Sequence, residues 1–231
     1  NNSKTKFSPQ ERFHNDGIIH NIDSPEAFDE IFFSSFKEDE IKSELKKFIN
    51  LVLLKYKKKR YLSKNNSNYK RIDLILDILP SAIFLIPFRE PLQQSKSLLN
   101  QHLNFVSLQT KNNFIERYMN NLGHFEFGIN HKSWFDPKKY SDPNNINYWL
   151  EQWHLFYDYL IKTYKENSRC IFLNYNNFNN LNHDSRFLDL TKINNEVKMN
   201  FKIINREIKE GFDNDLYSST LEIYNNIYSY I

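Results

Sequence analysis

The feature that most constrains the fold is a short apolar run at residues 83–88, Ile-Phe-Leu-Ile-Pro-Phe, which ends directly in Arg89. Its length and its turn-forming neighbours predict a buried strand. Glu90 and Pro91 follow, and because proline suits the first position of a helix, we expect a helix from here to about Val106. An arginine at the end of a strand, beside the positive N-terminus of a helix, is typical of a phosphate or sulfate site.

The segments around this run predict an α/β fold. Residues 60–64 are expected to form a short strand, residues 69–79 a helix that stops at Pro80, and residues 169–175 a further buried strand. Strands that alternate with helices join through right-handed crossovers, so a central parallel sheet flanked by helices is expected. The 231 residues are long enough for one domain, residues 1–231, with a sizeable core.

Apolar residues at helical spacing predict more helices, at residues 24–36, 39–56, 114–122 and 146–165 and near the C-terminus. Trp149 and Trp153 fall on the apolar face of one of them, so we expect both in the core. Residues 123–140 are irregular and rich in aromatic side chains. Trp134, in this irregular stretch, is therefore the better candidate for lining a pocket.

Charge and cysteine content narrow the class of protein. The formal net charge of +3 fits small anionic ligands but falls short of a nucleic-acid-binding composition. The basic run at residues 57–60 is interpreted as cations that follow the end of a helix. The lone Cys170 excludes an internal disulfide, which favours the cytoplasm, and we expect its thiol to be buried. No apolar run reaches the length of a membrane span, and no signal peptide is visible.

Several familiar site signatures are missing from the sequence. It has no Gly-x4-Gly-Lys-Ser/Thr loop, no Gly-x-Gly-x-x-Gly turn and no Gly-x-Ser-x-Gly elbow. Its seven histidines do not combine with acidic residues at the spacing of metal ligands, so no metal is expected. These absences argue against a Walker-type kinase, a dinucleotide-binding enzyme and an α/β-hydrolase.

The order of elements around Arg89 resembles the 3′-phosphate-binding half of the sulfotransferase family. Members of that family move a sulfonyl group from 3′-phosphoadenosine-5′-phosphosulfate (PAPS) to a hydroxyl or an amine. The resemblance rests on Lys64 in the preceding strand, on the apolar run ending in Arg89, and on Ser97 eight residues later. It implies a three-layer fold of the P-loop nucleotide-transferase type, with Arg89 and Ser97 binding the 3′-phosphate and Lys64 near the transferred sulfonate.

Two further stretches resemble the same family. Asn68 and Arg71 are similar to the asparagine and arginine that often follow the lysine strand in bacterial members. Residues 171–178 are similar to a late strand that ends in Tyr-Glu-Asp-Leu, with both acids replaced here. The family's 5′-phosphosulfate loop has no counterpart in these residues, and because the chain does not begin with methionine, we expect that loop upstream of Asn1.

The catalytic base departs from the cytosolic family pattern. Where many members carry a histidine two residues after the lysine, this chain has Asn66, which cannot accept a proton as a base. Other branches take an acid or a histidine from the segment after the donor loop. We therefore expect His14 and Asp16 to share this role. His124 and Glu126, in the aromatic stretch, are the reserve choice.

Three functional interpretations remain open from the sequence. The first is a PAPS-dependent sulfotransferase, without a metal, whose acceptor is a carbohydrate or a small metabolite. The second is a non-catalytic module that keeps the fold and binds a nucleotide or an anion. The third, a phosphoryl-transferring relative, would need a Walker lysine and a carboxylate for magnesium, and neither is found. The high aromatic share of 16% leaves room for an interface between copies of the chain.

Overall fold

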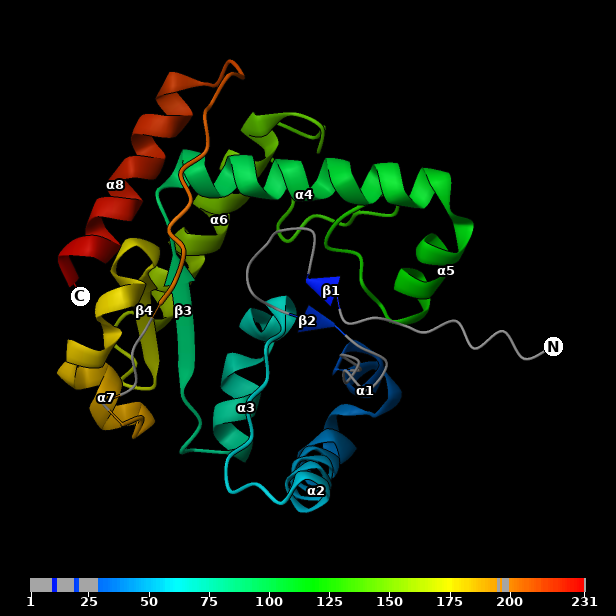
Figure 1. Cartoon of the computed structure of the whole chain (residues 1–231), viewed down its shortest axis with the longest axis vertical. Coiled ribbons are helices and arrows are strands. Elements are labelled where there is room, and N and C mark those ends of the chain that lie inside the picture. The colour runs from blue at the N-terminus through cyan, green and yellow to red at the C-terminus, as the bar shows by residue number, and fades with distance from the viewer. Residues whose placement is uncertain (1–9, 12–18, 21–28, 195, 197–199, 231) are drawn as a thin grey trace.

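A computed structural model describes residues 10–11, 19–20, 29–194, 196 and 200–230 (Figure 1). Within this part, a parallel sheet is formed by two strands, β3 (Phe84–Phe88) and β4 (Cys170–Asn174), in a register that pairs Phe84 with Cys170 and Phe88 with Asn174. A separate antiparallel pair joins β1 (Gln10–Glu11) to β2 (Ile19–His20). The fold is therefore a mixture of helix and strand, with a smaller parallel sheet than expected.

Helices make up most of the described chain. The α-helices are α1 (Asp29–Ser35), α2 (Glu38–Tyr56), α3 (Ile72–Ile78), α4 (Pro91–Lys111), α5 (Asn113–Asn121), α6 (Ile146–Tyr164), α7 (Ser185–Thr191) and α8 (Asn214–Tyr230). Two 3-10 helices, η1 (Asn66–Arg71) and η2 (Tyr175–His183), complete the set. The expected helices are confirmed where they are described, although α4 continues beyond Val106. Neither α7 nor η2 was expected.

Side-chain acceptors fix where the helices begin. Glu90 accepts hydrogen bonds from the first amides of α4, at 3.2 Å from Leu92 N and 2.8 Å from Gln93 N. Asparagine or aspartate side chains do the same at α6, α7 and α8. Each cap satisfies amides that have no partner within the helix, and so the chain's polar residues mark the helix starts.

The expected strand at residues 60–64 is wrong. These residues run without regular secondary structure from the end of α2 to η1. In the described chain the ladder of β3 joins it only to β4. A strand needs a neighbouring strand to bond to, and the short alternation around Leu62 does not provide one. Leu62 is 86% exposed, so its burial does not hold the segment against a sheet either. Lys64 therefore does not stand at the carboxyl end of a sheet strand.

The small sheet is covered on both faces. Phe88 and Phe172 pack with Trp153 of α6 and Ile227 of α8 in one cluster. Leu173 packs on the opposite side, against residues of η2 and α7. All five residues of β4 are buried, as expected, whereas β3 alternates between buried and more exposed positions. The proline within β3 fits a strand with an open edge, because proline has no amide to donate to a neighbour.

A second core lies between α4, α6 and the irregular segment after α5. Trp149 is fully buried there, and Trp153 is 1% exposed in the first core, so both expectations are confirmed. Cys170 is also buried, and burial raises the pKa of its thiol to about 11. The segment between α5 and α6 is irregular, as expected. Gly128 suits this segment because its φ is +94°, a conformation in which a side chain would be strained.

Candidate functional site

Arg89 lies where the two parallel strands end. It follows β3, and Tyr175 follows β4, so the parallel register brings both to the same edge of the sheet. The Arg89 guanidinium lies 4.7 Å from the centre of the Tyr175 ring, a cation–π distance. Arg89 is only 9% exposed. The structure therefore places this arginine at the expected strand end, in a largely desolvated position.

A second arginine, which the sequence did not single out, joins this edge. The segment of residues 200–213 runs beside β3 and the start of α4 (Figure 1). Gln93 ties it down, since Gln93 Oε1 accepts from Arg206 N at 2.7 Å and Gln93 Nε2 donates to Arg206 O at 2.9 Å. The same Oε1 accepts from Arg89 Nη2 at 3.1 Å. We call Arg89 and Arg206 the arginine pair.

Neither member of the arginine pair forms an ion pair with a described residue. Arg89 Nη2 donates to neutral acceptors, Gln93 Oε1 and the Ile204 carbonyl. In this part of the chain the buried Nε atoms of Arg89 and Arg206 lack a hydrogen-bond partner. Burial lowers the pKa of the Arg89 guanidinium, and the positive charge of Arg206 adds to this effect, whereas Tyr175 and Glu90 act in the opposite direction. Two neighbouring cations with unsatisfied donors form a site that an anion would stabilise.

The N-terminus of α4 is less open to an anion than the sequence suggested. The Glu90 carboxylate already accepts from the first amides of this helix, and Tyr217 donates to the same carboxylate at 2.9 Å. Ser97 is half-buried and lies on α4, almost two turns after Pro91. The candidate anion site therefore depends on guanidinium groups rather than on the helix end.

Lys64 belongs to a different group of contacts. Its ammonium donates to Asn66 Oδ1 at 3.0 Å, and its charge acts on His124. Next to it, Glu30 forms a paired interaction with Arg71, with N–O distances of 2.8 and 2.5 Å. Arg71 is thus held by a carboxylate. Asn68, the other residue of this family pattern, also lies in η1.

His124 and Glu126, the reserve base, form a close pair. His124 Nδ1 lies 3.6 Å from Glu126 Oε2, and both side chains are half-buried. The nearby Glu126 carboxylate raises the pKa of His124 above its usual value of 6.5, although burial acts in the opposite direction. Glu30 adds to the increase, while Lys64 opposes it. The charge of Lys64 therefore acts on the reserve base.

Replacing Glu126 with glutamine is expected to lower the pKa of His124, because burial then acts without the carboxylate. The raised pKa of His124 also sets how the stability of the wild type depends on pH. A raised folded-state pKa stabilises the wild type below pH 6.5, and this contribution disappears as pH rises through the folded-state pKa. Histidine NMR titration measures the shift. His102, whose pKa burial lowers to about 4, is the control signal, and an unchanged His124 titration would contradict the assignment.

The remaining expected site residues divide into two groups. His14 and Asp16 lie outside the described residues, so their place in the site stays a prediction. Trp134 is described and packs against the second core. The centre of its ring lies 5.9 Å from the centre of the Trp149 ring and 5.8 Å from that of Phe156. Through these contacts, Trp134 packs the irregular segment against α6.

Among the residues that the structure describes, no group of three or more histidine, cysteine, aspartate or glutamate side chains could hold a metal ion. No described helix combines the length and the apolar character that crossing a membrane requires.

Comparison with known proteins finds no relative. No protein-family model matches the chain, and neither a curated protein nor a solved structure is significantly similar to it.

Proposed function

We propose that the chain binds the 3′-phosphate of PAPS between Arg89 and Arg206 and transfers the sulfonyl group to a hydroxyl or an amine of a small-molecule or carbohydrate acceptor. The observation that carries this proposal is the arginine pair, whose buried Nε atoms have no partner in the described chain. A phosphate monoester carries close to two negative charges and several acceptor oxygens, which matches two guanidinium groups. Tyr175 supplies an aromatic face on the same edge of the sheet.

The reaction requires charge stabilisation and one proton acceptor. The bond between the sulfonyl sulfur and the bridging oxygen of PAPS breaks, and a bond to the acceptor oxygen or nitrogen forms. The released product is adenosine 3′,5′-bisphosphate, and the acceptor's proton passes to a base. Lys64 would stabilise the developing negative charge. His14 with Asp16 remain the proposed base, and the His124–Glu126 pair is favoured as the alternative because its two groups are paired and the charge of Lys64 acts on His124.

The proposal also includes the finer architecture. In a three-layer sulfotransferase fold, β3 and β4 would be two strands of a larger parallel sheet, with Ser97 adding a hydroxyl to the 3′-phosphate site. The proximity of Arg89 and Tyr175 at one carboxyl edge supports this arrangement, since open parallel sheets bind ligands at that edge.

Adenosine 3′,5′-bisphosphate is expected to raise the melting temperature of the chain. A ligand at about 100 times its dissociation constant stabilises the folded state by about 2.7 kcal/mol. Differential scanning fluorimetry measures the shift. The Arg206→Gln and Arg89→Gln proteins should lose most of it, whereas Arg117→Gln, an exposed arginine on α5, should keep it. Adenosine 5′-monophosphate, which lacks the 3′-phosphate, should give a much smaller shift.

A non-catalytic anion-binding module is the second candidate. It is favoured by Glu90, which occupies the helix end that a donor phosphate could use, and by Asn66, which holds the Lys64 ammonium. Both candidates predict bisphosphate binding at the arginine pair. Only the enzyme converts PAPS to adenosine 3′,5′-bisphosphate faster with an acceptor present, and only in the enzyme should Lys64→Ala slow turnover without weakening bisphosphate binding.

A further inference from the structure

The C-terminal end of α2 exposes large apolar side chains. Leu51 is 65% exposed and Leu54 is 74% exposed, and their three-residue spacing places them on one face of the helix. Leu62, in the segment that follows, is 86% exposed. The buried face of α2 instead carries Ile41, Leu45 and Ile49. Folding of the domain therefore leaves these leucines in contact with solvent.

The same end of α2 is strongly basic. Between residues 51 and 60 the charged side chains are all cations, Lys55, Lys57, Lys58, Lys59 and Arg60. All five are exposed. In the part of the chain that the structure describes, none of the ion pairs involves them. Their charges are therefore not neutralised by these residues.

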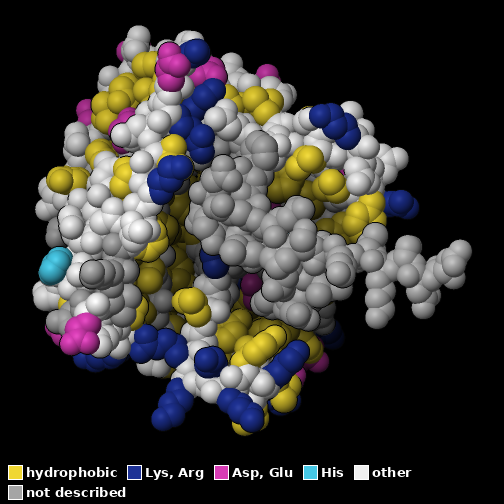
Figure 2. Space-filling model, in the orientation of Figure 1, with side chains coloured by type: hydrophobic (Ala, Val, Ile, Leu, Met, Phe, Trp, Pro, Cys, Tyr) yellow, Lys and Arg dark blue, Asp and Glu magenta, His cyan; other side chains and the backbone are white. Residues whose placement is uncertain are grey.

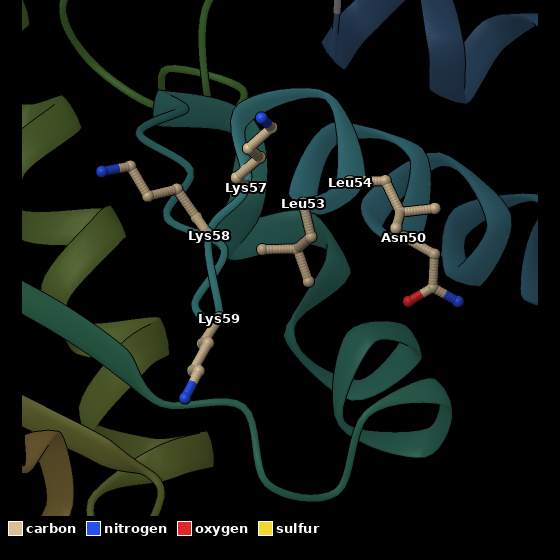
Figure 3. Close-up of a pocket in the computed structure, with 6 residues that line it drawn as sticks. All are labelled: Asn50, Leu53, Leu54, Lys57, Lys58 and Lys59. Atoms are coloured by element: carbon tan, nitrogen blue, oxygen red, sulfur yellow. The ribbon is translucent and has the colours of Figure 1, made fainter.

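The end of the helix arranges these side chains around the leucines. Lys57 adopts a left-handed conformation with φ 51°, and Lys58 N donates to Leu53 O at 2.9 Å, which closes the helix. The chain turns here, so the three lysines extend in different directions around Leu53 (Figure 3). They line an open hollow of about 540 Å³ together with Asn50, Leu53 and Leu54. Figure 2 shows basic side chains around hydrophobic ones at this end of the molecule.

Two simpler explanations account for only half of this surface. Cations near a helix C-terminus interact favourably with the helix dipole, but this effect needs only one or two of them and does not explain exposed leucines. A nucleic acid would use the cations, yet its phosphates offer the leucines nothing. An anionic lipid surface uses both, because headgroups attract the cations and the apolar side chains enter the boundary with the acyl chains.

We propose that this surface, which comprises Leu51, Leu54 and residues 55–60, docks the protein onto a bilayer that contains anionic phospholipids. The bilayer is the occupant that complements both the charge and the apolar side chains. The contact is peripheral and reversible, since it relies on a few leucines and on cations. It is independent of the arginine pair and of the proposed transfer reaction.

Sedimentation of the full chain with vesicles tests the proposal. We expect binding to vesicles of phosphatidylcholine with phosphatidylserine and little binding to phosphatidylcholine alone. Each cation near an anionic surface contributes about fivefold to binding, so Lys58→Gln with Lys59→Gln should weaken it about 25-fold. Leu51→Ser with Leu54→Ser leaves the charge unchanged and should weaken it about tenfold or more. These positions are exposed, so thermal melts should show that both variants fold.

The matched control replaces exposed lysines elsewhere. Lys111→Gln with Lys192→Gln removes the same charge from α4 and from the end of α7, and vesicle binding should change little. Equal binding to neutral and anionic vesicles would overturn the proposal, as would full binding by the leucine variant. A short DNA duplex or polyglutamate could instead bind more tightly than vesicles, with an affinity that the leucine substitutions do not change. The surface would then bind a polymeric anion, and the proposal would fail.

Discussion

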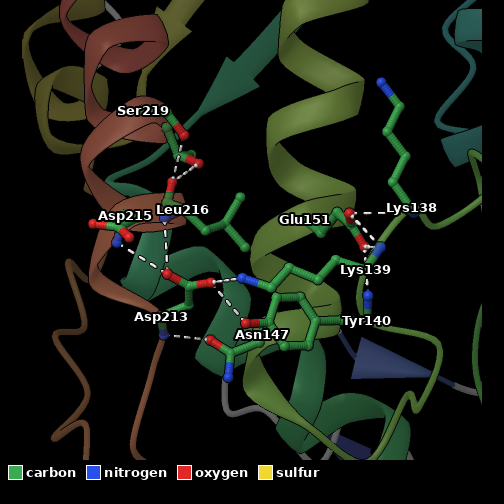
Figure 4. A network of polar contacts seen from close by, with 10 residues as sticks. Lys138, Lys139, Tyr140, Asn147, Glu151, Asp213, Asp215, Leu216 and Ser219 are labelled. Carbon is green, nitrogen blue, oxygen red and sulfur yellow. Dashed lines mark hydrogen bonds and ion pairs between the residues drawn. The ribbon is translucent and has the colours of Figure 1, made fainter.

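Replacing Glu151 with alanine is expected to lower the free energy of unfolding by about 4 kcal/mol. Glu151 is 6% exposed, and its carboxylate accepts hydrogen bonds from three successive backbone amides (Figure 4). These come from Lys138 N at 3.2 Å, Lys139 N at 3.0 Å and Tyr140 N at 3.0 Å. A hydrogen bond to a charged group contributes about 1.5–3 kcal/mol, so losing the carboxylate that accepts from all three amides is severe.

Chemical denaturation measures this change, and two variants on the same helix control it. Glu151→Gln keeps one side-chain oxygen and should cost clearly less than alanine. Asp158→Ala removes a partly exposed carboxylate that pairs with the exposed Lys162 at 2.8 Å, and such surface pairs contribute at most about 1 kcal/mol. If Glu151→Ala were no more destabilising than Asp158→Ala, Glu151 would not anchor the irregular segment.

Figure 4 also shows why this anchor matters beyond Glu151. Asp213 accepts from Lys139 Nζ at 2.6 Å and from Tyr140 Oη at 2.7 Å, and it also accepts from Leu216 N at the start of α8. The hydrogen bond from Lys139, and to a lesser extent that from Tyr140, lowers the pKa of Asp213 below its usual range. The irregular segment is therefore held to α6 by Glu151 and to α8 by Asp213, which fixes the chain just beyond residues 200–212.

Replacing Trp153 with alanine is expected to cost about 4 kcal/mol, the usual range for a buried aromatic side chain. Trp153 is 1% exposed, and the centre of its ring lies 4.3 Å from the centre of the Tyr157 ring. Its Nε1 donates to Gln94 Oε1 at 3.0 Å, and the same oxygen accepts from Arg89 N at 3.2 Å. The loss of Trp153 should therefore also disturb the backbone of Arg89.

Thermal and chemical unfolding of two variants separate these effects. Trp153→Phe keeps most of the ring but not the donor, so it should cost less than Trp153→Ala. Leu103→Ala, at a side chain that is 42% exposed on α4, is the control for an apolar loss outside the core. A cost for Trp153→Ala that only matches the control would contradict the assigned core. Bisphosphate binding by the folded Trp153→Phe protein reports on the placement of Arg89.

The sequence predicted the elements whose signals are local. The apolar runs of β3 and β4 and the helical spacing in α4 and α6 were sufficient, because burial of an apolar stripe decides such segments. Residues 60–64 carried a similar but shorter signal and formed no strand, since pairing depends on a neighbour that the segment itself does not specify. Helix α7 was missed because it follows a run of asparagines, although Asp184 caps it.

The site was predictable at Arg89 but not as a whole. A strand followed by an arginine is a local pattern, and the parallel register then explains why Tyr175 lies beside it. Arg206 lies in a segment without helical or strand periodicity, far along the chain from Arg89, and Gln93 bonds to both residues. The sequence predicted the helix start at Glu90 and Pro91, but not that the Glu90 side chain caps it and already satisfies the first amides.

A crystal structure of the protein with adenosine 3′,5′-bisphosphate tests the central claim most directly. The account predicts the 3′-phosphate within hydrogen-bonding distance of the guanidinium groups of Arg89 and Arg206, near the Tyr175 ring and the Ser97 hydroxyl, with both Nε atoms satisfied. Arg206→Gln crystals should lose this density. A nucleotide bound elsewhere, or an arginine pair left without a ligand at saturating nucleotide, would contradict the account.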